Sequence, residues 1–434
     1  MVRTRQPPVL ASPPMSDLAD SLRAFRHRNF RLYFTGQLVS LIGSWMQSVA
    51  QGWLMHRLTD SPFMLGLLAF AQFAPVIPLA LPAGAIADRV DKRKLLLITQ
   101  SLMLVQAVAI ATVVTLGTVR PWMVLALAVF YGIVNTFDLP ARQSFVIEMT
   151  GREDLANGIA LNSAAFNAAR IIGPAIAGLL VAGVGEAGCF WINAASFLAV
   201  IGGLAMIRTG SRSAAAAGAL GSTLRDGVRY AWNTRPIRNL LVLLAVCAGV
   251  GFQYNVLLPV YARTVLHAGA QTYGLLFAAF GLGSLIAAGR MTLKHDRWAL
   301  RRHLLLGLAS AGVGLAGFAW LRSLPWMLLA GGVAGFGLIL YVSSTNILIQ
   351  TVVDDRYRGR VMSLYTLMFV GTSPFGALLA GALAQRFGAP VATSFCALVL
   401  LGGALWMSRR LRVIAAREAA ERRGDAALEP DTVR

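Results

Sequence analysis

The chain has 434 residues, of which 56% are hydrophobic and only 13% are charged, whereas a soluble domain has about 25% charged residues. Its formal net charge is +20, from 39 Lys and Arg against 19 Asp and Glu. These cations are dispersed over many loops, which argues against nucleic-acid binding and favours a membrane protein that faces anionic headgroups. Composition therefore excludes a water-soluble globular class.

In chain order, the first 22 residues lack the apolar core of a signal peptide, so we expect them to belong to a cytoplasmic tail. Twelve apolar stretches follow, and nearly all are long enough to cross a hydrocarbon core of about 30 Å as helices. Only Arg170 interrupts the fifth. The stretches are residues 32–55, 62–87, 95–119, 121–137, 155–185, 187–207, 239–262, 268–289, 304–321, 323–353, 361–385 and 387–408.

The positive residues alternate between the loops. The N-terminus and every second loop hold nearly all Lys and Arg, whereas the opposite loops hold only Arg57, Arg120, Arg263, Arg322 and Arg386. Positive charge stays on the cytoplasmic side of a membrane. We therefore expect a twelve-span protein of a bacterial inner membrane, with both termini in the cytoplasm.

The chain repeats itself. The sequence LGLL that begins at Leu65 matches YGLL that begins at Tyr273, 208 residues on, and Pro174 matches Pro374, 200 residues on. A duplicated six-helix unit around an axis normal to the membrane suits a transporter that rocks one half against the other. The expected parts are a cytoplasmic tail (1–31), a six-helix bundle (32–207), a cytoplasmic connector with a short amphipathic interfacial helix (208–238), a second bundle (239–408) and a cytoplasmic tail (409–434).

Residues that carry catalytic chemistry are missing. Cys189, Cys247 and Cys396 lie in apolar stretches without metal-ligand spacing, and the sequence has no nucleophile motif, ligand cluster or phosphate loop. We predict that the protein is not an enzyme, binds no metal or cofactor and does not use ATP directly.

Residues 84–94, with the sequence GAIADRVDKRK, resemble the signature loop of the major facilitator superfamily, although Asp91 stands where that family usually has Gly. The resemblance covers residues 20–411 and implies two parallel six-helix bundles that transport by alternating access. It also implies a gating role for Gly84, Asp88, Arg89 and Arg93.

Asp88 is the carboxylate of this loop. At the cytoplasmic ends of spans two and three it can meet the positive N-terminal end of span eleven, near Gly359, and latch the two halves together in the outward-facing state. The alternative is a positive-inside loop with an incidental acid.

A second stretch, residues 137–174, is similar to a narrower branch of that superfamily. This branch contains the enterobactin exporter, other transmembrane secretion effectors and some macrolide efflux pumps. The residues that carry this resemblance are Phe137, Asp138, Pro140-Ala141-Arg142-Gln143, Asp154-Leu155-Ala156-Asn157, Leu161-Asn162, Asn167 and Arg170-Ile171-Ile172-Gly173-Pro174.

Span five carries Gly173, Pro174 and Gly178, which resemble the Gly-Pro motif of antiporting members, with Ala177 where the family often has Gly. Pro174 lacks an N–H, so the carbonyl of Arg170 loses its helical partner and we expect a bend there. The small residues allow close approach of a neighbouring helix. Generic small-residue packing is the alternative.

Three charged residues are candidates for coupling. Arg170 lies roughly 21 Å into span five, where a charge is costly; it binds an anionic group of the cargo or modulates a proton site, or else it bonds freed carbonyls and the amides of Asn162 and Asn167. Asp138 lies near the cytoplasmic end of span four, and Arg142 is its expected partner at helical spacing. Asp138 is either a proton-coupling carboxylate or part of a structural ion pair.

Amide side chains inside the spans are candidates for the cargo cavity, and each is equally consistent with an interhelical hydrogen bond. Amides together with indoles suit a bulky, partly aromatic cargo. The candidates are Gln47, Gln51, Asn135, Asn162, Gln253, Asn255 and Asn346.

The sequence thus predicts a monomeric secondary-active transporter that exports a small organic molecule, a siderophore or a macrolide-like drug, in exchange for protons. An importer on the same fold and a non-transporting membrane scaffold or sensor are the alternatives. Expected partners are the small-molecule substrate, protons and membrane lipid, but no nucleic acid.

Overall fold

The computed structural model describes residues 22–151, 153–207, 220–291 and 296–422, and the regular elements in these ranges are all helices. Parts of the expected N-terminal tail, connector and C-terminal tail lie outside the described residues. The N-terminal half consists of η1 (Arg23–Arg26), α2 (Arg28–Thr59), α3 (Pro62–Phe73), α4 (Val76–Arg89), α5 (Lys92–Thr115), α6 (Pro121–Thr150) and α7 (Leu155–Met206).

The C-terminal half follows the helix α8 (Leu220–Asn233), and two of its spans are broken into two helices. Its elements are α9 (Arg235–Gly251), α10 (Tyr254–Val260), η2 (Tyr261–Val265), α11 (Ala270–Met291), α12 (Arg297–Trp320), α13 (Leu324–Val352), η3 (Asp355–Tyr357), α14 (Arg358–Gly371), α15 (Ser373–Phe387) and α16 (Ala389–Arg422).

Ten helical stretches in the described residues are long and apolar enough to span a membrane. One of them, the 52-residue α7, breaks at Gly185, whose φ of 73° ends one span and begins the next. The remaining span is α2, which has 32 residues but is less apolar because it contains Gln37, Gln47 and Gln51. The predicted all-helical membrane fold of twelve spans is confirmed.

The two parts of α7 run in opposite directions along α2. In the first part, Gly158 lies near Phe30 and Gly173 near Trp45, so the chain runs parallel to α2. In the second part, Gly203 lies against the carbonyl of Leu32, back at the start of α2. The helix continues through Pro174 and its non-helical residue is Gly185, so the bend expected at Pro174 stays a prediction.

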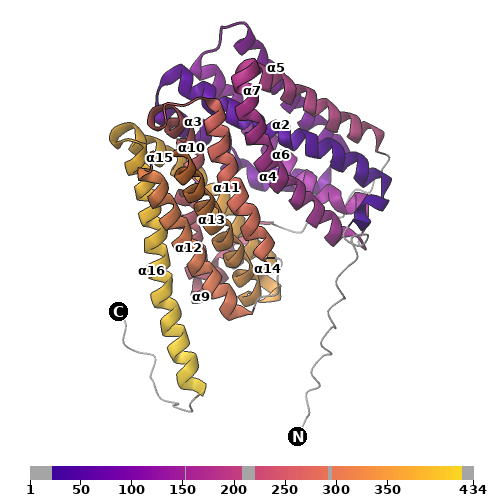
Figure 1. Ribbon diagram of the computed structural model, residues 1–434. Helices are drawn as coiled ribbons and strands as arrows, with labels where there is room; N and C mark the ends of the chain where they lie inside the picture. The colour runs from indigo at the N-terminus through magenta and orange to yellow at the C-terminus, as the bar shows by residue number, and fades with distance from the viewer. Residues whose placement is uncertain (1–21, 152, 208–219, 292–295, 423–434) are drawn as a thin grey trace.

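The two halves lie side by side, with the N-terminal half indigo to magenta and the C-terminal half orange to yellow (Figure 1). Phe30, Phe145 and Phe197 are buried in the first half and Phe318 and Tyr341 in the second, and one cluster of buried apolar residues continues from the first half into the second. The loops that are poor in Arg lie at one end, here called the loop end. The other end, here called the terminal end, carries η1 and the end of α16.

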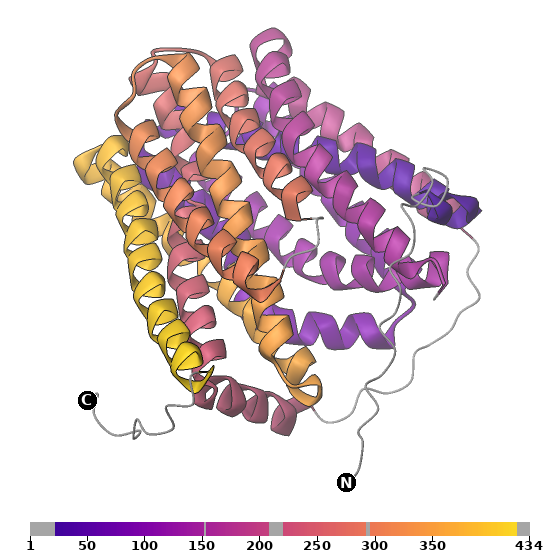
Figure 2. The same cartoon turned by 60° about the horizontal axis from the view of Figure 1, so that its bottom comes forward.

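Helix α8 packs across the terminal end of the C-terminal half (Figure 2). The ring of Tyr230 stacks on Tyr357 with centroids 4.2 Å apart, and its hydroxyl accepts a hydrogen bond from the backbone N–H of Asp354 at 3.1 Å. Helix α8 is therefore attached to η3, directly before α14, in the C-terminal half.

Candidate functional site

The two halves meet along an interface, here called the seam, where α7 packs against α11 and α3 packs against α15. On the α7 side, a Cβ added at Gly178 would lie 2.9 Å from the carbonyl oxygen of Ala270, and one added at Gly274 would lie 2.6 Å from the carbonyl oxygen of Pro174. Because these neighbours are backbone atoms, only glycine fits. Gly173 faces another way, against α2, where its Cβ would lie 2.6 Å from the Cβ of Trp45.

The α3 side of the seam is equally tight. A Cβ added at Gly66 would lie 2.5 Å from the carbonyl oxygen of Ala377, and one added at Gly381 would lie 2.8 Å from the carbonyl oxygen of Pro62. Both contacts lie on the loop-end parts of their spans. The loop end of the seam is therefore closed backbone against backbone.

Polar contacts join the halves at the same end. The guanidinium of Arg263 lies 3.1 Å from the carboxylate of Asp60 and donates to the carbonyl of His56 at 3.3 Å. The hydroxyl of Ser61 donates to the amide oxygen of Gln385 at 2.7 Å. All of these contacts must break before the loop end can open.

The terminal end of the seam is different. Asp88 and Arg89 are exposed. A Cβ added at Gly84 or at Gly359 would meet no atom within 4 Å. Arg93 alone of the predicted gating residues is bonded here, because its guanidinium donates to the carbonyls of Leu204 and Ala205 at 2.7 and 2.8 Å, inside the N-terminal half. In this conformation Asp88 does not join the two halves.

Arg170 lies on the seam, one turn of α7 before Pro174. Its Nη2 donates to the hydroxyl of Tyr254 on α10 at 3.2 Å, and its Cζ lies 6.0 Å from the centre of the Trp45 ring on α2. Its Nε is buried and has no hydrogen-bond partner. The side chain thus reaches across from the N-terminal to the C-terminal half.

An aromatic ring from each half contacts this guanidinium, and further rings pack against these two. Trp45 lies edge to face with Phe166 at 5.8 Å and Phe277 at 6.0 Å, and Tyr254 stacks on Phe280 at 3.8 Å. We call Trp45, Phe166, Tyr254 and Phe277 the aromatic cluster. Phe166 is 45% exposed, and the cluster lies on the terminal-end side of the tight contacts of α7 at Pro174 and Gly178.

Asp138 and Arg142 lie together inside the N-terminal half. The Arg142 guanidinium contacts the Asp138 carboxylate, and α6 remains helical through Pro140. The carboxylate is fully buried and also accepts hydrogen bonds from Thr99 at 2.7 Å and Gln100 at 2.8 Å. This charge is therefore balanced locally, unlike that of Arg170.

The amide candidates divide into two groups. Gln47 is buried in a chain in which it donates to Gln106 and accepts from Asn193; Gln51 and Gln253 are buried with backbone carbonyls as acceptors. These three side chains are held between helices, and we do not propose them as cargo contacts. The partly exposed candidates are Asn135, Asn162, Asn255 and Asn346.

Some residues of this site escaped the sequence reading. The sequence alone singles out none of Phe166, Phe277, Asp60, Ser61 and Gln385. A phenylalanine four residues before an intramembrane arginine was an available signal, because positions i and i+4 share one face of a helix. Nothing in the sequence pairs Asp60 with Arg263, which are about two hundred residues apart.

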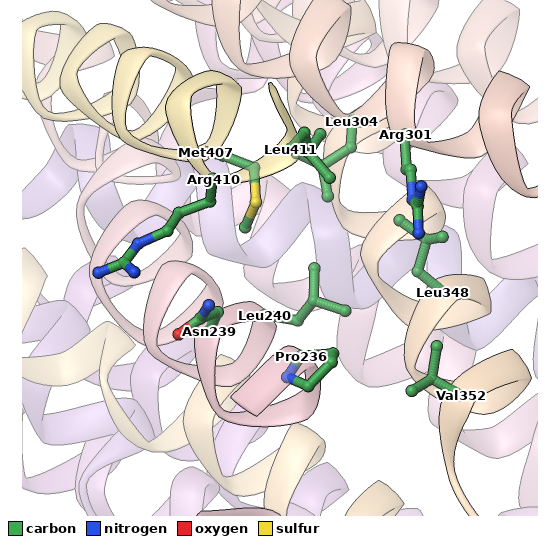
Figure 3. A pocket seen from close by; sticks show the side chains of 10 residues that line it. All are labelled: Pro236, Asn239, Leu240, Arg301, Leu304, Leu348, Val352, Met407, Arg410 and Leu411. Carbon is green, nitrogen blue, oxygen red and sulfur yellow. The ribbon is translucent and has the colours of Figure 1, made fainter. Parts of the chain in front are cut away.

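A hollow in the described part of the chain lies elsewhere (Figure 3). It lies between the terminal ends of α9, α12, α13 and α16, and its lining includes Leu240, Leu304, Leu348, Arg301 and Arg410. Because all of these residues belong to the C-terminal half, rocking at the seam would not alternate its access. We therefore do not regard it as the transport site.

Two six-helix halves that pack backbone against backbone at the loop end and share a cluster between them have the architecture of the major facilitator superfamily. The family model of transmembrane secretion effectors matches residues 19–431, and the chain belongs to this family. It is a multi-pass membrane transporter of small molecules and not an enzyme, and both the resemblance and the fold predicted from sequence are confirmed.

Characterised relatives support this assignment. The chain is 27% identical to the multidrug efflux pump Tap of Mycolicibacterium fortuitum, over 80% of this chain and 87% of that protein. It is 24% identical to the staphyloferrin A transporter of Staphylococcus aureus, over 82% and 90% of the two chains. It is 25% identical to the enterobactin exporter EntS of Escherichia coli, over 85% and 88%.

Solved structures share the fold. The nucleoside transporter NupG aligns with a TM-score of 0.70 at 12% identity, over 88% of this chain and 98% of that chain. A bacterial homologue of the lysosomal transporter Spinster, described as inward-facing and occupied, aligns with a TM-score of 0.70 at 14% identity, over 92% and 98%.

Proposed function

We propose that this protein exports a small organic molecule, a siderophore or a macrolide-like drug, from the cytoplasm of a bacterium by alternating access, in exchange for protons. The observation that carries the proposal is the one-sided seam. Glycine contacts between backbones close the loop end, whereas Gly84 and Gly359 at the terminal end have open space around them. A rocking motion of the two halves would open the loop end and close the terminal end.

Orientation follows from charge. The terminal end carries most of the Lys and Arg, so we assign it to the cytoplasm, together with both termini. In that orientation the described conformation faces inward, and the central cluster is open to molecules from the cytoplasm. The named relatives Tap and EntS are a pump and an exporter, which supports the outward direction. We further propose that the protein works as a monomer in contact with anionic lipid.

For proton coupling we propose the pair of Asp138 and Arg142. A carboxylate in a low-dielectric interior can be neutralised either by a bound proton or by a neighbouring guanidinium, and Asp138 has such a neighbour. If Arg142 moves during rocking, a proton would replace it on Asp138. Thr99 and Gln100 would hold the carboxylate in place in both states.

The test uses everted membrane vesicles that contain the full chain, with an acidic lumen generated by respiration. Expected is accumulation in the lumen of a macrolide or an iron-free siderophore, and its loss when a protonophore dissipates the gradient. The matched control is the same vesicle preparation with Gly178→Leu, which we expect to be blocked at the seam. Export of cargo from the vesicle lumen would instead establish an importer, and unchanged accumulation after the protonophore would contradict proton exchange.

A further inference from the structure

Arg170 carries a positive charge that no carboxylate balances within the described part of the chain. Its bonded neighbour is the neutral hydroxyl of Tyr254, and its Nε is buried without an acceptor. An intramembrane arginine is costly, and a buried donor without a partner adds to that cost. Some anion, or water in an open cavity, has to compensate this charge during the transport cycle.

Three acids of this half are already paired. Asp138 is paired with Arg142, and Glu148 with Lys92 at 2.8 Å. At the loop end, Glu186 is paired with Arg57 at 2.8 Å. Asp88 is exposed at the terminal end, and no ion pair among the described residues includes Arg170, so an anion from outside the chain can balance this charge.

The surroundings of Arg170 define the rest of such an anion. Trp45 from the N-terminal half and Tyr254 from the C-terminal half contact the guanidinium, and Phe166 and Phe277 pack against the Trp45 ring. Rings of this kind favour stacking with another aromatic system and hold a cation on their faces. A planar guanidinium with a free Nε–H edge favours an oxyanion with two acceptor oxygens.

We propose that this transporter selects organic anions that carry an aromatic ring, and that Arg170 is the residue that binds their acidic group. The ring of the ligand stacks in the aromatic cluster. After a movement of the Arg170 side chain, the oxygens of the ligand accept hydrogen bonds from Nε and Nη2. Because ligand contacts come from both halves, binding draws the halves together at Arg170. The transport part of this inference rests on the proposed function, whereas the binding part does not.

The experiment uses two dyes on one xanthene framework, anionic fluorescein and a cationic rhodamine ester. Dye anisotropy measures binding to the purified full-length protein in lipid nanodiscs, and everted vesicles measure transport of the same dyes. The variants are Arg170→Gln, which removes the charge but keeps an amide donor, and Arg170→Lys, which keeps the charge but loses the planar edge. Arg57→Gln is the matched control, because it removes one guanidinium that lies at the loop end beside Glu186.

The wild-type protein and Arg57→Gln are expected to bind fluorescein at least tenfold more tightly than the rhodamine ester. Arg170→Gln is expected to bind fluorescein about tenfold to a hundredfold more weakly, since a hydrogen-bonded charge contact has that magnitude, and to lose the preference. Arg170→Lys is expected to keep the preference with weaker binding, which also guards against a folding defect.

The outcomes separate the two proposals. Equal binding of both dyes by the wild-type protein, or an unchanged preference in Arg170→Gln, overturns the selection of anions while export itself can stand. Binding of fluorescein that depends on Arg170, without any energised transport of it, supports this inference and counts against the proposed export.

Discussion

The two ends of the seam share two membrane spans but differ in how closely the halves pack. At the loop end, Gly178 and Gly66 bring the backbones of the two halves into contact, with Cβ positions only 2.9 and 2.5 Å from a carbonyl oxygen. At the terminal end, Gly84 and Gly359 stand on the continuations of two of these spans with open space around them. The difference suggests that glycine is placed at both ends because each must close in one of two conformations.

The largest expected effect comes from filling the closed end. Gly178→Leu puts a side chain where the backbone of α11 now lies, so the loop end can no longer close and cargo transport in everted vesicles should fall at least about tenfold. Gly183→Leu is the matched control on the same helix, because a Cβ there meets nothing within 4 Å. Equal loss of transport in both variants would mean that helix perturbation, and not the seam, is responsible.

The next effect concerns the buried pair away from the seam. Asp138→Asn leaves the guanidinium of Arg142 buried without its counter-charge, which costs about 3–5 kcal/mol of stability, so we expect poor expression and no accumulation of cargo. The double variant with Arg142→Gln removes both charges. It should fold, exchange cargo across the membrane without a gradient and fail to accumulate it.

This double variant separates the two roles of Asp138. Full gradient-driven accumulation by the double variant, measured with the same cargo, would make the pair structural and would remove it from the coupling mechanism. Loss of both exchange and accumulation in well-folded protein would point to a wider role in the transport cycle.

A smaller effect is expected at the open end. If Asp88 meets the N-terminal end of α14 when the terminal end closes, Asp88→Asn removes about 1 kcal/mol from that state and lowers transport roughly fivefold. Asp88→Glu should restore most of the activity because it restores the charge. A wild-type transport rate for Asp88→Asn would refute the latch.

The smallest effect is expected from the ion pair across the closed end. Asp60 is 71% exposed and Arg263 is 37% exposed, so solvent screens their attraction and Asp60→Asn should change the transport rate by no more than about twofold. Arg57→Gln breaks a similar ion pair that does not cross the seam. A larger effect of Asp60→Asn than of Arg57→Gln would mean that the Asp60–Arg263 pair stabilises the closed loop end. A complete block of transport by Asp60→Asn would mean that glycine packing alone does not close this end.

Sequence periodicity and charge predicted much of this architecture. The apolar stretches indicated the spans, because the thickness of a bilayer sets the length of a helix that crosses it. The loop charges indicated the orientation, because loops rich in Lys and Arg stay on the cytoplasmic side. The spacing of Asp138 and Arg142 predicted their contact, since residues four apart meet on a helix. The sequence predicted close approach of a neighbouring helix at Gly173 and Gly178, but not which helix approaches, because that depends on the tertiary arrangement.

The central site could be predicted only in part for the same reason. Arg170 is recognisable as a charge inside an apolar stretch, but the sequence does not show that Tyr254 contacts it or that Phe277 packs against Trp45, because these residues lie on other helices. Gln47 was equally consistent with a cavity residue and with an interhelical hydrogen bond. The structure favours the second alternative, because Gln47 is buried in a hydrogen-bonded chain with Gln106 and Asn193.

The most direct test of the rocking seam is a pair of distances measured by spin labels in nanodiscs, after replacement of the three buried native cysteines. One pair, at Leu116 and Ser323, spans the loop end, and the other, at Lys94 and Arg302, spans the terminal end. Relative to the parent protein and to Gly183→Leu, the Gly178→Leu variant should lengthen the first distance and shorten the second. A change at one end without the opposite change at the other would contradict alternating access by rocking of the two halves.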